Sequence, residues 1–539
     1  MSNGPKICLI DVVDPKNTSH EPPLALVMLA SYLIQHNILP ISNIKIIDNV
    51  DSDPELVIAL FRPDIIGFSV KTPFYHIATS LAKKLRRISS ACFIIGGYHI
   101  SALPTYLDKN FDIGVIGEGE KTLSEVVEIL KSDSSLSVQK LSSVDSIVFR
   151  DDDGELIITK RRPLLFPDEI PYINWDLLPK DRIFYYRPII KDDRAETMRI
   201  GYIFTARGCP YHCSFCAHQV LWPQYRGFRL YSVERVGQEI EFLYRTFGIN
   251  TIQILDDTFS FAVSISRIRE LIKELKKRNL FNKVFFYNIF IRANIVNEEL
   301  VGLLKELGTL SVFIGIESGS QRILSYLKDG PLTIADIKRA ILLFGKAGIY
   351  VTGSFMLFSP NEERKDIMKT YELTKWFAKQ PNSLTLRHYV TTPYPGTKLW
   401  NEAIQKGLIF EDKVNWKDFV MYNARSNKLP RVFFKNVSSV RDYDKIWKKF
   451  SDIKLSMETK LKNKKNWKNA EHKALLENNK LLALYYRKIA KDNILGRISR
   501  LYHNPKVTLR KVKKRPILIL KYIMKDVIKI VGINEDSSR

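Results

Sequence analysis

Cysteine is scarce in this chain, with five among 539 residues. Two of them, Cys8 and Cys92, lie far apart in the apolar runs KICLIDV and ACFIIGG, a setting typical of small buried side chains. A disulfide framework is therefore not expected. No charged-then-apolar leader opens the sequence, and no run of eighteen apolar residues occurs in it. We expect a reducing, cytoplasmic location, where clustered cysteines usually bind metal or carry out redox chemistry.

Disorder of the whole chain is also not expected, because 45% of the residues are hydrophobic, enough for ordinary cores. The length predicts roughly three or four domains. The formal charge of +25 is unevenly distributed: residues 431–539 hold 29 Lys or Arg and 10 Asp or Glu, a net charge of +19. The first 430 residues carry only about +6. The basic character therefore belongs to a C-terminal segment.

Residues 1–131 alternate short β-type runs with helical patterns, which predicts an α/β domain with a doubly wound parallel sheet. The expected strands are 6–12, 44–48, 64–70, 92–97 and 113–117. Sheets of this kind bind ligands at the carboxyl ends of their strands. Those ends carry SVKT (69–72), GGYH (96–99) and GEGE (117–120), in which glycine allows a backbone to approach a bulky ligand.

Residues 132–195 are expected to form a linker, with a β-hairpin at VFRDDDGELIITK and then a proline-rich stretch. A second strand–helix series over 196–410 predicts a partial (β/α)6 barrel, whose chemistry lies on the loops after the strands. Residues 411–539 are expected to be basic and mainly helical. The expected barrel strands are 202–207, 251–257, 284–290, 310–318, 350–358 and 383–392.

Three cysteines with the spacing Cys209-x3-Cys213-x2-Cys216 follow the first expected barrel strand. Three thiolates on one loop can bind three irons of a cubane iron–sulfur cluster and leave the fourth iron open. The alternative is zinc, with His212 or His218 as the fourth ligand beside the three thiolates. Structural zinc sites usually take two separated pairs of ligands, and the sequence has no second cysteine pair, so we favour the cluster.

The motif resembles that of radical S-adenosylmethionine (SAM) enzymes, in the class B methyltransferase-like branch that carries a cobalamin-binding domain. Further segments resemble this family in order and spacing, and together they cover roughly residues 5–410. They are PPLALVMLASYL, GGYH, GEGE, DDTF, RAN, GIESGS and PYPGT. The segment FMLFSPNEE departs from the glycine-rich form that is common after the fifth barrel strand.

The resemblance implies a site in the barrel. Cys209, Cys213 and Cys216 would bind a [4Fe–4S] cluster, whose open iron would chelate SAM. Glu317 would accept hydrogen bonds from the ribose hydroxyls, and Arg292 would bind the methionyl carboxylate. Asp256 and Asp257 would lie near the methionyl ammonium, and Phe215 beside SAM. Strand-end carboxylates also commonly cap the next helix, and that alternative stays open.

The resemblance also implies a cobalamin site at the strand ends of the first domain. The residues implied are Ser69, Thr72, Gly96, Gly97, Tyr98, Gly117, Glu118 and Gly119. Family members that supply a histidine to cobalt carry Asp-x-His-x-x-Gly, and His20 lacks this spacing. We therefore expect no protein histidine on the cobalt and ordinary roles for His76 and His99. The alternative is a degenerate domain that no longer binds cobalamin.

The activity implied is generation of a 5′-deoxyadenosyl radical and, most simply, methylation of an unactivated carbon in a small-molecule or lipid substrate. Flavodoxin or ferredoxin would supply the electron. Cyclisation, ring contraction or coupling would use the same parts, and the remaining alternative is a non-catalytic protein that binds metal through the three cysteines. A methylthiotransferase is disfavoured, because its second cluster needs three further cysteines.

The basic segment ends with RPILILKYIMKDVIKIVGI (515–533), in which Lys521, Lys525 and Lys529 recur every four residues. Such a helix could lie at the inner face of the membrane with its lysines at the headgroups, or pack on the barrel with its lysines in water. Both interpretations stay open. Nucleic-acid binding is not expected, since no binding module accompanies the charge.

Overall fold

The computed structural model describes residues 4–14, 21–48, 53–133, 136–192, 194–223, 225, 227–259, 265–419, 440–464 and 467–478. His20 and the segment 515–533, with Lys521, Lys525 and Lys529, lie outside these residues. By its internal contacts the chain divides into a main unit, residues 1–178 and 182–474, and a second unit, 179–181 and 475–539. Both sheet systems belong to the main unit. None of the described helices is both long and apolar enough to cross a membrane.

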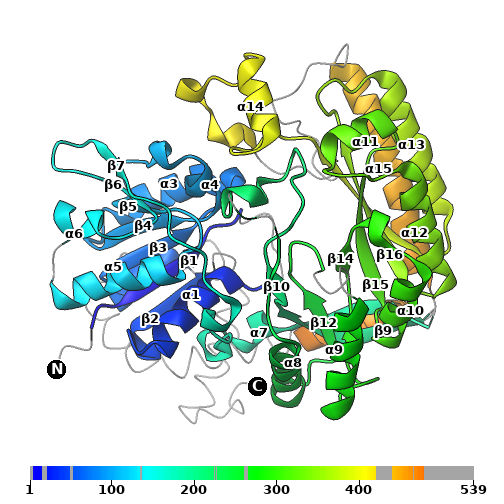
Figure 1. Cartoon of the computed structure of the whole chain (residues 1–539), viewed down its shortest axis with the longest axis horizontal. Coiled ribbons are helices and arrows are strands. Elements are labelled where there is room, and N and C mark those ends of the chain that lie inside the picture. The colour runs from blue at the N-terminus through cyan, green and yellow to red at the C-terminus, as the bar shows by residue number, and fades with distance from the viewer. Residues whose placement is uncertain are drawn as a thin grey trace, which may run out of the picture. The chain divides into compact units, whose positions relative to one another are not determined.

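The N-terminal sheet has seven strands in the order β2-β1-β3-β4-β5-β6-β7, drawn in blue and cyan in Figure 1. Its first five strands are parallel, as predicted, and β1 lies between β2 and β3, where the strand order reverses. In open α/β sheets this reversal marks the ligand crevice at the carboxyl ends. The strands are β1 (Ile7–Asp11), β2 (Ile44–Asp48), β3 (Ile65–Ser69), β4 (Cys92–Gly96), β5 (Ile113–Val115), β6 (Ile147–Arg150) and β7 (Leu156–Ile158).

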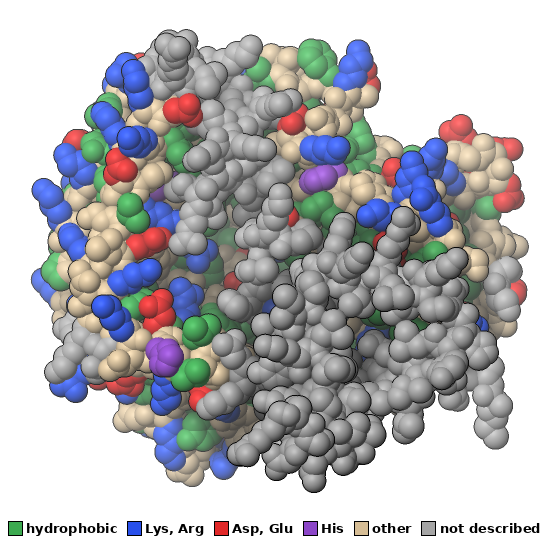
Figure 2. Space-filling model, turned by 180° about the vertical axis from the view of Figure 1, so that it is seen from behind, with side chains coloured by type: hydrophobic (Ala, Val, Ile, Leu, Met, Phe, Trp, Pro, Cys, Tyr) green, Lys and Arg blue, Asp and Glu red, His purple; other side chains and the backbone are tan. Residues whose placement is uncertain are grey.

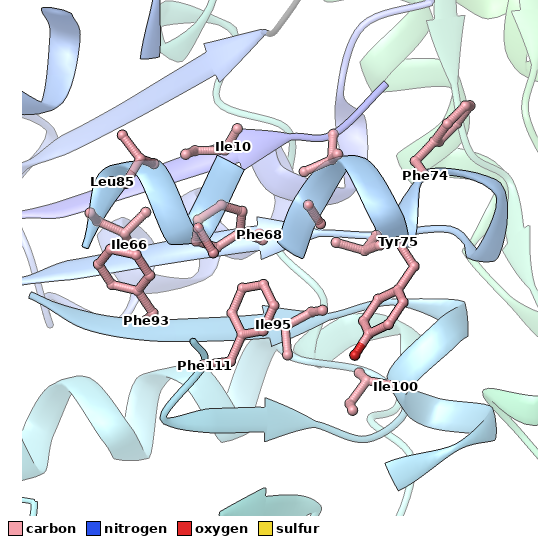
Figure 3. Packing of buried hydrophobic residues seen from close by; sticks show 14 of the residues in the cluster. Ile10, Ile66, Phe68, Phe74, Tyr75, Leu85, Phe93, Ile95, Ile100 and Phe111 are labelled. Atoms are coloured by element: carbon pink, nitrogen blue, oxygen red, sulfur yellow. The ribbon is translucent and has the colours of Figure 1, made fainter. Parts of the chain in front are cut away.

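Helices cover both faces of this sheet, because alternate residues of each strand point to opposite sides. In β1, Ile7 and Leu9 pack under α1 (Leu24–Gln35) and α5 (Glu120–Ser132). Cys8 and Ile10 belong to the opposite core, with α2 (Pro54–Phe61), α3 (Tyr75–Leu85) and α4 (Tyr98–Ala102). Figure 3 shows Phe68, Phe93 and Phe111 gathered below α3 in that core. Burial raises the pKa of the Cys8 thiol to about 12, as expected of a structural side chain.

The expected hairpin forms as β6 and β7, with a turn held by Asp151. Its carboxylate accepts hydrogen bonds from the amides of Asp153, at 3.1 Å, and Glu155, at 2.8 Å. The hairpin does not stand apart as a ribbon in a linker. Strand β6 pairs antiparallel with β5 and thereby extends the sheet. The extension covers the edge that β5 would otherwise expose.

The second strand–helix series forms six parallel barrel strands, the third of them broken, as predicted for a partial (β/α)6 barrel. They pair in two sheets, β13-β12-β9-β8 and β14-β15-β16-β17. The edge strand β8 runs antiparallel to β9. The strands are β8 (Tyr185–Lys191), β9 (Arg194–Ile203), β12 (Thr251–Ile254), β13 (Phe285–Phe286), β14 (Ile289–Ile291), β15 (Ser311–Glu317), β16 (Tyr350–Leu357) and β17 (Ser383–Val390).

Two strands differ from the prediction. The first begins at Arg194 rather than 202, because β8 and β9 form a hairpin that starts within the expected linker. The expected strand 284–290 is broken into β13 and β14 at Asn288, whose φ of 56° is left-handed. The Asn288 amide donates to Ser311 Oγ at 3.0 Å. This bend allows β13 to pair with β12 while β14 pairs with β15.

Helices follow the barrel strands and lie outside them in Figure 1. They are α8 (Val233–Phe247), α9 (Ile265–Lys277), α10 (Glu298–Glu306), α11 (Gln321–Leu327), α12 (Ile334–Lys346), α13 (Arg364–Lys379), α14 (Lys398–Gln405) and α15 (Val440–Lys462). Helix α15 packs on β17 and α13 through Phe450. Figure 2 shows Lys and Arg interspersed with Asp and Glu over the described part of one face, which agrees with the nearly neutral charge of the first 430 residues.

Candidate active site

A two-stranded neck closes the loop that carries the three cysteines. Strands β10 (Ala206–Arg207) and β11 (Arg229–Leu230) pair antiparallel, with Arg207 opposite Arg229. The loop starts at Gly208, whose φ is +93°, and a Cβ built there would lie 2.5 Å from the carbonyl oxygen of Gly227. Only glycine fits this left-handed close approach. The neck therefore fixes where the cysteine segment leaves the barrel.

Cys209, Cys213 and Cys216 lie on this loop and are all half-buried. The Cys216 amide donates to the Cys213 carbonyl at 3.0 Å, which folds the segment back on itself. Burial raises the pKa of Cys209 to about 11 and that of Cys216 to about 12, so both are thiols in the free protein. Among the described residues, no three His, Cys, Asp or Glu side chains converge closely enough to hold a single metal ion.

Two cationic side chains, Arg292 and Lys328, lie near Cys213. Arg292, which follows β14, points one guanidinium nitrogen at Cys213 Sγ, 3.8 Å away. The same side chain donates to Asn294 Oδ1 at 3.0 Å and to the Asp329 carbonyl, and stacks 4.0 Å above the Tyr211 ring. A cationic neighbour favours the thiolate form that iron requires. The donor set therefore suits a thiolate-bound cluster.

Glu317 ends β15 in a strained conformation. Its φ of +58° is left-handed, and the register with β16 shifts between Gly315 and Glu317. Glu317 is 5% exposed, and its carboxylate lies 2.8 Å from Lys328 Nζ, with Ser354 Oγ at 3.5 Å. Backbone strain of this kind is often retained at functional positions.

Lys328 is a site residue that the sequence analysis missed. Burial lowers its pKa, but Glu317 and Cys213 outweigh burial and raise the pKa, so the side chain is an ammonium. Its Nζ also lies 5.7 Å from the centre of the Phe215 ring, and Phe215 packs beside Met356 of β16. Local sequence gives no signal for Lys328, which follows α11 in an ordinary LKDG turn.

The two aspartates after β12 have different surroundings. Both Asp256 oxygens are engaged: Oδ1 accepts from the amides of Thr205 at 2.7 Å and Ala206 at 3.1 Å, and Oδ2 accepts from the Thr205 hydroxyl. Burial raises the pKa of Asp256 to about 7 despite these bonds. Asp257 is partly exposed, and its Oδ1 lies 2.8 Å from Nδ1 of His218. Asp256 therefore holds the turn that leads to the cysteine loop, whereas Asp257 faces the site.

The segment FMLFSPNEE at the end of β16 contains no glycine. Two of its residues nevertheless adopt the left-handed backbone conformation that glycine favours. Phe358 and Asn361 adopt left-handed φ values of 64° and 62°. Beside them, Glu362 is 1% exposed, and its Oε2 accepts from the Ser359 amide at 2.9 Å. Burial raises the pKa of Glu362 to about 7.

In the N-terminal domain, the residues expected to line a cobalamin lie at the carboxyl ends of neighbouring strands. Ser69 ends β3 and Gly96 ends β4, while Gly97 has a φ of +102° that places the next turn against the backbone of Val70. Tyr98 follows, and its pKa is raised well above its usual value by burial, then by Asp257 and Cys216. The charges of these two barrel-side groups therefore act on the Tyr98 hydroxyl.

The turn after β5 also reaches the cysteine loop. Gly117 has a φ of +83°, and its Cβ position lies 3.4 Å from the Leu221 carbonyl oxygen. Gly119 precedes α5, with Leu29 packed against it. Glu118 was expected beside cobalamin, and its carboxylate instead contacts Arg207, Arg229 and Trp222. Its expected contact with the corrin stays a prediction.

His99 packs between aromatic rings, and His218 contacts a carboxylate. His99 is fully buried, with its ring stacked 3.8 Å from that of Tyr75 and edge-on to Trp416, and its Nδ1 lies 3.3 Å from Thr72 Oγ1. Burial lowers the pKa of His99 to about 3. His212 and His218 were the two candidate zinc ligands. Nδ1 of His218 lies 2.8 Å from Oδ1 of Asp257.

Two family models match this chain: the radical SAM superfamily over residues 203–374 and the B12 binding domain over residues 12–127. An uncharacterised methyltransferase of Pyrococcus horikoshii is 31% identical over 408 residues, which are 74% of this chain and 81% of that protein. Cytidylyl-2-hydroxyethylphosphonate methyltransferase of Streptomyces wedmorensis is 26% identical over 67% of this chain and 70% of its own length.

The structure of the radical SAM methyltransferase TsrM from Kitasatospora setae, solved with tryptophan substrate and a SAM analogue, has a TM-score of 0.58 at 19% identity. The match covers 75% of this chain and 76% of TsrM, and at this identity it shows the fold alone. Both family models match this one chain. In the structure, the turn after β5 of the first sheet contacts the neck of the cysteine loop. The chain therefore belongs to the radical SAM superfamily, in the branch with a B12-binding domain, whose cofactors are a [4Fe–4S] cluster, SAM and cobalamin.

Proposed function

We propose that this protein is a C-methyltransferase, which transfers a methyl group to an unactivated carbon of a small-molecule or lipid substrate. One observation carries the proposal. The turn at the carboxyl end of the first sheet contacts the neck of the cysteine loop, where the Glu118 carboxylate lies 3.1 Å from Arg207 and also pairs with Arg229. A corrinoid bound over the first sheet and a cluster bound by the cysteine loop would therefore face one reaction space.

Cys209, Cys213 and Cys216 would bind the cluster and release their protons as it binds. Arg292 and Lys328 would offset the thiolate charge from one side, since both raise the positive potential at Cys213. When bound, the three cofactors supply one-electron cleavage of SAM and a methyl group for transfer.

SAM would lie between the cysteine loop and the barrel strand ends. Glu317 would accept from the ribose hydroxyls, with its carboxylate held in place by Lys328. Arg292 would bind the methionyl carboxylate and Phe215 would contact the adenosyl portion. Asp257 would face the methionyl ammonium, whereas Asp256 supports the turn at Thr205.

Cobalamin would lie over the strand ends of the first domain, against Ser69, Thr72, Gly96, Gly97, Tyr98, Gly117, Glu118 and Gly119. The left-handed φ values of Gly97 and Gly117 allow these turns to pack closely against Val70 and Leu221, which gathers the turns at the strand ends where the corrinoid would lie. His99 would not bind the cobalt, since its ring is packed between Tyr75 and Trp416.

Methyl transfer is tested with SAM that carries a trideuterated methyl group, hydroxocobalamin and a one-electron reductant. Mass spectrometry of the extracted corrinoid should show a trideuterated methyl group on cobalt. If 5′-deoxyadenosine accumulates while the corrinoid stays unmethylated, the radical chemistry stands and the function becomes cyclisation, ring contraction or coupling.

The expected partners are the substrate and a one-electron donor of the flavodoxin or ferredoxin class, in the cytoplasm. We also propose that residues 515–533 contact the inner face of the membrane. Co-sedimentation with anionic vesicles at physiological salt tests it, with Lys521, Lys525 and Lys529 replaced by Gln as the control. Equal recovery of both proteins in the supernatant would refute membrane contact.

A further inference from the structure

The neck of the cysteine loop holds two buried guanidinium groups side by side. Arg207 and Arg229 occupy paired positions of β10 and β11, and their side chains are 15% and 8% exposed. Like charges at directly opposed strand positions repel each other. The neck therefore needs carboxylates to be stable, and in the described part of the chain the carboxylates paired with these arginines come from outside the barrel.

Both carboxylates come from the N-terminal domain, Glu118 from the turn after β5 and Glu120 from the first position of α5. Glu118 Oε1 lies 3.1 Å from Arg207 Nη1, and the Arg229 guanidinium donates to both Glu118 oxygens. Glu120 Oε1 accepts from Arg207 Nη2 at 2.5 Å. A third donor reaches Glu118 from within the loop, where Trp222 Nε1 lies 3.0 Å from Oε1.

Glu118 is a carboxylate at neutral pH despite its burial. Its side chain is 9% exposed, and burial alone would raise its pKa, but Arg207 and Arg229 outweigh burial and lower it. Removing the charge from such a buried group leaves its partners uncompensated, which is costly. The contact is therefore specific for a carboxylate at this position.

The backbone of the same turn is tied to the cysteine loop by separate contacts. The Gly117 amide donates to Ser101 Oγ at 2.9 Å. Arg161 then joins Ser101 to the loop, because its two terminal nitrogens donate to the carbonyls of Ser101, at 3.0 Å, and Val220, at 3.2 Å. The turn is therefore joined to the cysteine loop at Val220 as well as at the neck.

We propose that Glu118 is a positioning residue that couples the corrinoid site to the cluster site. The inference rests on the proposed function in one respect, the assignment of the backbone at Gly117 and Gly119 to the corrinoid. One short turn then contacts the corrinoid through its backbone and the neck of the cysteine loop through its carboxylate. Binding at one site shifts the turn, and the shift changes the geometry of the other. Such coupling is reciprocal in binding free energy.

The test measures the affinity of the full chain for hydroxocobalamin with and without a reconstituted cluster. The wild-type Kd is expected to differ between the two forms by about fivefold or more, the lower range of measured couplings. In Glu118→Gln, which keeps the shape and removes the charge, the ratio should fall to about one. Glu125→Gln is the matched control, because Glu125 lies on α5, the helix that follows this turn, and pairs with Arg162 rather than with the loop.

A second readout is the electron paramagnetic resonance spectrum of the reduced cluster. Hydroxocobalamin should change the spectrum in wild type and in Glu125→Gln, and leave it unchanged in Glu118→Gln. Wild-type coupling retained in Glu118→Gln would overturn the proposal, as would a wild type that binds both cofactors with no coupling.

If the wild type binds iron but no corrinoid, the cobalamin assignment fails, and with it the coupling. Hydrogen exchange then decides whether Glu118 holds the neck at all. Amides of residues 206–230 should exchange at least about tenfold faster in Glu118→Gln than in Glu125→Gln, a factor that corresponds to about 1.4 kcal/mol of local stability. Equal exchange would refute the contact itself.

Discussion

Lys328 Nζ lies 2.8 Å from Glu317 Oε1, and the two side chains are 12% and 7% exposed. Glu317 adopts a left-handed φ of 58° to present this carboxylate at the end of β15. Lys328 also faces Cys213 and Phe215. The ion pair therefore joins the expected ribose-binding carboxylate to the cysteine loop.

Replacing Lys328 by Met should lower stability strongly, because Glu317 is left buried without its cation. Breaking a buried ion pair by removing one partner typically costs about 3–5 kcal/mol. The midpoint of thermal unfolding should fall, and SAM affinity should fall with it. Calorimetry and equilibrium dialysis with SAM measure the two effects.

The control for this substitution is Lys398→Met, which removes an exposed lysine 5.4 Å from the Tyr326 ring. It should leave both quantities nearly unchanged. The double variant Glu317→Gln with Lys328→Met should recover part of the stability but not the SAM affinity. If Lys328→Met unfolds at the wild-type temperature, the pair is not a buried ion pair in solution.

The barrel was predictable because its strands are short apolar runs separated by helical periodicity. The third strand was predicted as one run, and its break at Asn288 was not foreseen, since a left-handed residue within an apolar run leaves no periodic signal. Strand β8 was assigned to a linker because it follows a proline-rich stretch, and it contains Pro188 itself, which an edge strand tolerates.

The three cysteines could be proposed as cluster ligands from sequence because they lie within eight residues. Lys328 and the partners of Glu118 could not, since their contacts join residues far apart in the chain. Arg207 and Glu120, for example, are separated by 87 positions. Asp256 and Asp257 could not be distinguished in the sequence. In the fold, the Asp256 carboxylate accepts from Thr205, whereas the Asp257 carboxylate contacts His218.

Gly208→Ala should prevent assembly of the cluster. The new methyl group would meet the Gly227 carbonyl oxygen at 2.5 Å in a left-handed backbone, so the neck must open. Iron and sulfide bound after anaerobic reconstitution should drop severalfold.

Gly154→Ala is the control for Gly208→Ala. Gly154 has a similar φ of +87° in the β6–β7 turn, but no atom lies within 4 Å of its Cβ position. Gly154→Ala therefore costs only the free energy of placing alanine in a left-handed backbone, about 1 kcal/mol. This variant should bind as much iron as wild type does. Equal iron in both variants would contradict the geometry of the neck.

Glu362→Gln should stabilise the protein at pH 8 and have little effect near pH 4.5. Burial raises the pKa of Glu362 from 4.5 to about 7, so the folded protein retains a proton that the unfolded chain has released. Stability from this group is therefore present below pH 4.5 and lost as pH rises through 7. The gain above pH 7 is at most roughly 3 kcal/mol.

Thermal unfolding of wild type and Glu362→Gln across this pH range measures the effect. Glu363→Gln, a neighbouring and more exposed carboxylate, should show no comparable trend. A constant difference between Glu362→Gln and wild type at every pH would mean that Glu362 is not buried as a neutral acid.

The central claim, that the cysteine loop and the first sheet together form one cobalamin-dependent radical SAM site, is tested most directly by a single reconstitution. Purified protein is reconstituted anaerobically with iron and sulfide, then incubated with dithionite, SAM and hydroxocobalamin. Wild type and Cys92→Ala should form 5′-deoxyadenosine and retain corrinoid, whereas Cys213→Ala should form no 5′-deoxyadenosine. A wild type that forms no 5′-deoxyadenosine and purifies with zinc on the three cysteines would contradict the account.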